Sequence, residues 1–143
     1  MRTGYRIALY LGAALIAAPA YAVDLACLSR NPSSKDWVPE AVFVSIDTQS
    51  LKARVLDEYT LSVMEGPALA EVSRPTSKRL QLNWALIDAT DISGRSTNVK
   101  FKMTLNLKTF KFNYSGVSES SFLTPGSASG TCAPWDRIPD PKS

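Results

Sequence analysis

The sequence contains no histidine among its 143 residues. A Ser-His-Asp or Cys-His catalytic centre therefore has no base, and the most common nitrogen ligand of zinc is missing. The seven glycines are spread along the chain and form no phosphate-binding loop. These absences argue against nucleophilic, zinc and nucleotide chemistry. We expect a non-enzymatic binding protein without a cofactor or a metal.

Long apolar runs are also absent, apart from one at the start of the chain. Residues 1–22 place Arg2 and Arg6 before an apolar run over 7–18 and end in Ala-Tyr-Ala. A positive start, a short apolar core and a small-x-small end are typical of a secretory signal peptide, and the run is short of the about 20 residues that cross a bilayer. We therefore expect a leader over 1–22 and a single exported domain over 23–143, in the periplasm or secreted.

Cysteine is scarce, and its placement is informative. Cys27 and Cys132 lie near the two ends of the expected domain. Two cysteines in an exported chain are typical of a structural disulfide. The alternative is a lipidated Cys27 in the lipobox-like stretch Leu25-Ala26-Cys27, but Asp24 stands where a lipobox needs a leucine-like residue. The pattern favours a disulfide that joins the two ends of the domain.

Net charge gives little guidance about a partner. The chain has 16 basic and 13 acidic residues, and the expected leader holds two of the basic ones, so the domain carries 14 basic against 13 acidic residues. A nearly neutral domain does not by its bulk charge favour nucleic acid or any other partner. Only the local distribution of charge is informative.

Apolar residues alternate with polar ones at a period of two, which predicts β-strands. Residues 98–114 predict a hairpin with Leu105 opposite Phe110, and residues 41–55 predict a second with Ile46 opposite Leu51. Further strands are expected over 59–63, 69–72, 79–88 and 127–131. The expected fold is all-β, a single small antiparallel β-barrel or sandwich of about six to eight strands in a hairpin meander, with one end-to-end disulfide.

The main candidate binding surface is a group of cations without nearby acids. Lys100, Lys102 and Lys111 are expected on one outward face of the 98–114 hairpin, with Arg95 and Lys108 near its loops. Such a face suits an anionic envelope lipid, a glycan or an acidic protein. The aromatic residues of the hairpin face away from the lysines, which argues against nucleic acid. The alternative is that the lysines only keep the sheet soluble.

A second hypothesis is a carrier that holds a small ligand inside the barrel. Trp37, Trp84 and Trp135 are the candidate residues near such a site. The alternative is that Trp84 belongs to the core, while Trp37 and Trp135 pack together near the disulfide.

A third hypothesis is a glycan-active enzyme that uses carboxylates. Its candidates are Asp57, Glu58, Asp88 and Asp91, although the same residues are typical of strand bends and turns. In general plan the chain is similar to small exported bacterial β-barrel proteins, among them the periplasmic lysozyme inhibitors. That likeness concerns architecture alone, because the chain has none of their inhibitory-loop motifs.

Overall fold

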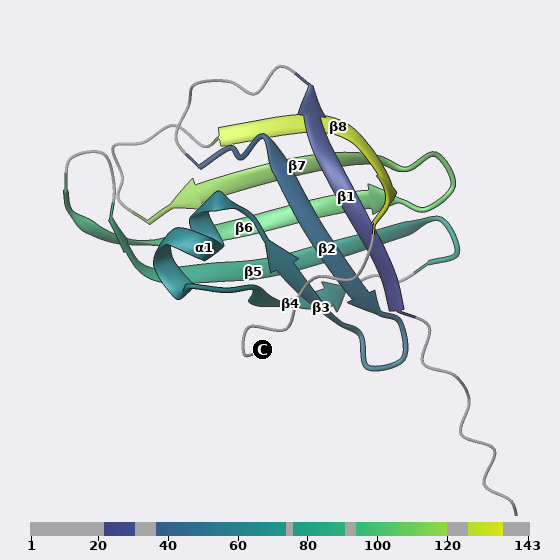
Figure 1. Cartoon of the computed structure of the whole chain (residues 1–143), viewed down its shortest axis with the longest axis horizontal. Coiled ribbons are helices and arrows are strands. Elements are labelled where there is room, and N and C mark those ends of the chain that lie inside the picture. The colour runs from purple at the N-terminus through teal and green to yellow at the C-terminus, as the bar shows by residue number, and fades with distance from the viewer. Residues whose placement is uncertain (1–21, 31–36, 74–75, 91–93, 120–125, 136–143) are drawn as a thin grey trace, which may run out of the picture.

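The computed structural model of the protein describes residues 22–30, 37–73, 76–90, 94–119 and 126–135. Eight antiparallel strands follow one another around a closed barrel, and the last strand pairs with the first (Figure 1). The all-β class, the barrel and the meander are thereby confirmed. The elements are β1 (Ala22–Arg30), β2 (Ala41–Asp47), β3 (Lys52–Leu56), α1 (Glu58–Met64), β4 (Ala68–Ser73), β5 (Arg79–Thr90), β6 (Ser96–Asn106), β7 (Lys111–Ser118) and β8 (Gly126–Pro134).

The core of the barrel follows directly from the period-two alternation. Val44 on β2, Leu82 on β5 and Met103 on β6 are completely buried, and their neighbours in sequence are more exposed. Alternate residues of every strand fill the interior, as they do in other small barrels. The expected leader lies outside the described residues except for Ala22, and within those residues no helix has the length and apolar content needed to cross a bilayer.

A disulfide closes the seam between the first and last strands. Cys27 on β1 lies directly opposite Cys132 on β8, and their sulfur atoms are bonded. The predicted disulfide is therefore confirmed, and the lipidated Cys27 is ruled out because its thiol is used. The two backbones approach so closely here that a Cβ added at Gly130 would overlap the carbonyl oxygen of Leu28. Glycine at position 130 lets the seam close.

The predicted register of the β6–β7 hairpin was wrong by two residues. Leu105 lies opposite Phe112, not Phe110. The side-chain oxygen of Asn106 accepts hydrogen bonds from the N–H groups of Lys108 and Thr109, and the loop ends with Phe110 in the left-handed conformation at φ 56°. Because Phe110 belongs to the loop, the strand begins one residue later than the alternation indicated.

The β2–β3 hairpin has the same kind of turn, and its predicted register was also wrong by two residues. Ile46 lies opposite Ala53, not Leu51. Asp47 accepts hydrogen bonds from the N–H groups of Gln49 and Ser50, and Leu51 takes the left-handed conformation at φ 55°. A left-handed residue with a Cβ costs about 1–2 kcal/mol. Both hairpins thus hold a bulky apolar residue at a turn position that glycine would occupy without strain.

The strand predicted over 59–63 is a short helix instead. Asp57 caps α1, and its side chain accepts hydrogen bonds from the N–H groups of Tyr59 and Thr60. The hydroxyl of Thr60 accepts a bond from the N–H of Asp57 in return, which completes a capping box. This reciprocal cap explains why the alternating sequence Tyr59-Thr60-Leu61-Ser62-Val63 forms a helix. Figure 1 shows α1 at the end of the barrel opposite the β6–β7 turn.

Candidate functional site

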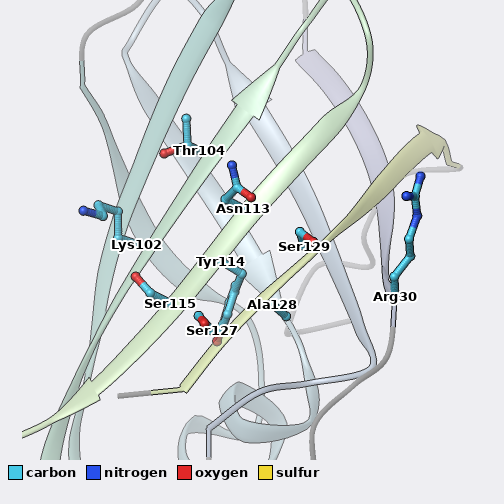
Figure 2. A pocket seen from close by; sticks show the side chains of 9 residues that line it. All are labelled: Arg30, Lys102, Thr104, Asn113, Tyr114, Ser115, Ser127, Ala128 and Ser129. Carbon is cyan, nitrogen blue, oxygen red and sulfur yellow. The ribbon is translucent and has the colours of Figure 1, made fainter. Parts of the chain in front are cut away.

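A polar groove crosses the outward face of the barrel where β6, β7, β8 and β1 lie side by side (Figure 2). Two rows of cross-strand neighbours form it. The first row is Lys102, Ser115 and Ser127, and the second is Thr104, Asn113, Ser129 and Arg30. These side chains share a face because each alternates with a residue whose side chain faces the barrel interior, such as Tyr114.

The charges of the groove stand at its two ends. Lys102 lies on β6 and Arg30 on β1, on opposite sides in Figure 2. The two residues are separated by three strand spacings across the sheet and by two residues along it, which places their backbones about 15 Å apart. Strands β6, β7 and β8 contain no aspartate or glutamate. The groove therefore carries a positive charge at each end, and β6, β7 and β8 add no acidic side chain to it, which favours a ligand with more than one anionic group.

Between the charges, the groove offers hydroxyl and amide groups. Its volume is about 440 Å³, within the range of small-molecule sites. Serine, threonine and asparagine side chains both donate and accept hydrogen bonds. A second depression of about 470 Å³, which Asn83, Ala85, Lys100 and Val117 help to line, shares Lys102 and Ser115 with the groove. A chain-like ligand that follows the groove past Lys102 would enter this second depression.

The three strand lysines of the predicted basic face all point outward but do not form one cluster. Lys100 is paired with Glu119, with 3.5 Å between the lysine Nζ and the carboxylate oxygen. Lys111 begins β7, and the corrected register puts it about 13 Å along the sheet from Lys102. Of these three lysines, only Lys102 lines the groove.

The two loop cations lie at opposite ends of the barrel. Arg95 precedes β6, at the end where α1 lies, whereas Lys108 lies in the β6–β7 turn at the other end. They cannot contact one compact ligand together. The predicted set of five cations therefore separates into Lys102 in the groove, Lys100 beside it, Arg95 at one end of the barrel, and Lys108 with Lys111 at the other.

The tryptophans lie in three different environments. Trp84 belongs to the core and stacks on Phe101 with 5.3 Å between ring centroids, as expected for a core residue. The expected pairing of Trp37 with Trp135 was wrong. Trp37 is buried against Tyr59 at the α1 end, whereas the half-exposed Trp135 packs on Phe43 at the outside of the barrel. Of the three tryptophans, Trp37 and Trp84 are buried in the core and Trp135 is not.

Four buried polar atoms near α1 have no hydrogen-bond partner among the described residues. They are Trp37 Nε1, Asp57 Oδ2, Trp84 Nε1 and the Tyr114 hydroxyl. Trp84 and Tyr114 are in ring contact at 5.7 Å, and the charge of Asp57 helps to raise the pKa of Tyr114. Buried polar groups normally have partners. These atoms can offer three donors and one acceptor to a small polar molecule.

Asp57 is the most perturbed carboxyl group of this region. Burial raises its pKa to about 6, although hydrogen bonds from the N–H groups of Thr60 and Tyr59 oppose the rise, and the charge of Glu58 adds to it. Burial also raises the pKa of Tyr114 well above its ordinary value. The interior near α1 thus disfavours charge on both residues.

The carboxylates of the enzyme hypothesis do not assemble. Asp57 is buried as a helix cap, while Glu58 is exposed on α1. Asp88 lies at a bulge of β5, where it accepts a hydrogen bond from Ser96, and Asp91 lies outside the described residues. Within the described ranges, no group of three or more acidic or cysteine side chains is arranged to hold a metal ion.

Sequence reasoning missed most of the groove. Arg30 is more than 70 positions from Lys102 in sequence, and only closure of β1 against β8 puts it opposite Ser129. The predicted register put Lys111 opposite Thr104. Asn113 lies there instead, so its place in the groove was not predicted. The sequence signal that could have revealed the groove was the repeated polar-x-polar spacing on β6, β7 and β8.

In comparisons with known proteins, no family, no curated protein and no solved structure matches the chain. Any functional inference therefore depends on the geometry of the residues described above.

Proposed function

We propose that this protein is an exported, non-enzymatic binding domain that holds an anionic glycan along the groove between Lys102 and Arg30. The disulfide supports an oxidising, exported location, because such bonds persist outside the cytosol. The ligand would be an oligosaccharide that carries carboxylate, phosphate or sulfate groups.

One observation carries this proposal: two rows of outward polar side chains cross three acid-free strands and end in cations on opposite sides. An arginine fork and a lysine ammonium group suit anionic oxygens. The hydroxyl and amide groups between them match the hydroxyl groups of sugars. This combination favours an acidic glycan over a neutral one.

The lining of the groove argues against nucleic acid as the ligand. Tyr114 is the one aromatic residue among the nine that line it, and its side chain is buried in the barrel. Binding of single-stranded nucleic acid uses exposed aromatic rings on which the bases stack. A flexible polyanion that is recognised by charge and hydroxyl groups fits the surface better.

The experiment is calorimetric titration with a heparin hexasaccharide at low ionic strength, using processed protein expressed from the full sequence. We expect measurable binding that Lys102→Gln and Arg30→Gln together weaken about tenfold or more, since each charged hydrogen bond contributes about 1.5–3 kcal/mol. Added salt should weaken wild-type binding.

Lys52→Gln with Lys78→Gln is the matched control, because it also removes two exposed cations, one on β3 and one in the β4–β5 connection, away from the groove. It should bind like the wild type. Equal weakening by this control would show that the hexasaccharide responds only to net charge. Equal binding of neutral maltohexaose would contradict recognition of anionic groups.

The four unpartnered polar atoms near α1 favour a second candidate function, a carrier of a small polar molecule inside the barrel. Native mass spectrometry of the purified protein should then show a bound small molecule. Trp84→Phe, which removes the indole N–H but keeps an aromatic ring, should reduce its occupancy. A wild-type spectrum that shows only the mass of the protein chain would count against the carrier.

A further inference from the structure

The end of the barrel opposite α1 carries a second cationic surface, separate from the groove. Lys78 and Arg79 lie where the β4–β5 connection meets β5, while Lys108, Phe110 and Lys111 lie in or beside the β6–β7 turn. We call these five residues the basic turn surface. Figure 1 shows both turns at the end away from α1.

Backbone hydrogen bonds hold the two turns together. The N–H of Leu107 donates to the carbonyl oxygen of Lys78 at 3.0 Å, and Arg79 pairs with Asn106 across β5 and β6. Thr76 fixes the first turn, because its hydroxyl oxygen accepts from the N–H groups of Lys78 and Arg79. The four cations are therefore held by two turns that are hydrogen-bonded to each other.

The charge of this surface is entirely positive. All four cations are exposed, and residues 76–79 and 106–111 contain no aspartate or glutamate. Like charges on neighbouring turns repel one another. An anionic surface would relieve that repulsion, and each lysine or arginine that approaches it would add to the attraction.

Phe110 gives this surface an apolar tip. It is 37% exposed and takes the left-handed conformation, which disfavours residues with a Cβ. Asparagine or glycine would be less strained there. A bulky apolar residue at such a turn, surrounded by lysines, fits the boundary between lipid headgroups and acyl chains, where aromatic residues are enriched.

We propose that the basic turn surface docks on an anionic lipid bilayer, with Phe110 entering the headgroup region and the cations contacting lipid phosphates. The cations and the aromatic tip favour a bilayer over a glycan in solution, because a glycan offers no apolar layer. Docking at this end would leave the groove on the side of the barrel exposed to solvent.

The experiment is co-sedimentation of processed protein with vesicles of phosphatidylcholine alone or with about 30% phosphatidylglycerol. We expect binding only to the anionic vesicles. Lys78→Gln with Lys108→Gln should reduce the partition coefficient about tenfold or more, because the variant loses two of the four cations that approach the anionic lipids. Phe110→Asn should reduce it several-fold while the melting temperature stays equal or rises, because asparagine tolerates the left-handed conformation.

Leu51→Asn is the matched control, because Leu51 holds the same left-handed turn position in the β2–β3 hairpin. It should relieve the same strain and leave vesicle binding unchanged. The Lys102→Gln, Arg30→Gln variant should also bind vesicles normally. Failure of glycan binding in the groove can therefore be distinguished from failure of bilayer docking at the basic turn surface. Equal sedimentation with both vesicle types, no sedimentation with either, or an equal loss with Leu51→Asn would overturn the proposal.

Discussion

Removing the disulfide is expected to destabilise the barrel strongly. Cys27 and Cys132 are separated by 105 positions in sequence, and a crosslink that closes a loop of about 100 residues stabilises a protein by about 4–5 kcal/mol in the chain-entropy model. The variant Cys27→Ala, Cys132→Ala should therefore melt about 15 °C below the wild type. Thermal unfolding followed by circular dichroism measures this difference.

Reduction provides the control for this experiment. Dithiothreitol should lower the melting temperature of the wild type by a similar amount and leave the double alanine variant unchanged. A variant that melts within a few degrees of the oxidised wild type would show that the backbone pairing of β1 with β8 closes the seam by itself.

Asp57 is expected to make the protein less stable as the pH rises. Its pKa is about 6 in the folded barrel against an ordinary value of 3.8, so between these values the folded state binds the proton more tightly than the unfolded state does. The free energy of unfolding must then fall as pH rises from about 4 to beyond 6. The loss amounts to about 2–3 kcal/mol, since one pKa unit corresponds to about 1.4 kcal/mol.

Asp57→Asn separates the charge of this residue from its role as a helix cap. Asparagine still accepts hydrogen bonds at the start of α1 but cannot ionise. The variant should therefore exceed the wild type in stability by about 2–3 kcal/mol at pH 8, with the difference shrinking toward pH 4. Urea unfolding at several pH values measures both curves.

The alanine variant tests the cap itself. Asp57→Ala removes the hydrogen bonds to the N–H groups of Tyr59 and Thr60, so it should be about 1 kcal/mol less stable than Asp57→Asn at every pH. If the free energies of unfolding of the wild type and Asp57→Asn changed in parallel with pH, the buried carboxyl group would not be the cause of the pH dependence of stability.

The sequence was sufficient to predict the all-β class, most of the strands and the disulfide, because period-two alternation determines which residues face inward. It left a barrel and a sandwich open, gave no strand for β1, and indicated a strand where α1 forms. Ile46 and Leu105 face the interior, as the alternation indicates, even though both hairpin registers were wrong. A shift of two residues preserves the face of every side chain. The register itself depends on left-handed conformations at Leu51 and Phe110, and bulky residues give no signal of that conformation.

The candidate site was less predictable, since it depends on which strands become neighbours. Arg30 reaches the groove only because β1 pairs with β8, and a period-two pattern does not reveal that pairing. Asp57 was predicted as a solvated bend because Tyr59, Leu61 and Val63 alternate as in a strand. The helix that buries its carboxyl group spans only seven residues, and its main sequence signal is the spacing of Asp57 and Thr60.

The most direct test of the proposed function is an NMR titration of ¹⁵N-labelled protein with the heparin hexasaccharide. We expect the largest amide shifts in the groove, at Asn113, Ser115, Ser127 and Ser129, and smaller shifts elsewhere. Shifts centred on the indole N–H signals of Trp37 and Trp84 would instead indicate an interior site. The absence of shifts at the groove residues at saturating hexasaccharide would contradict glycan binding along β6, β7 and β8.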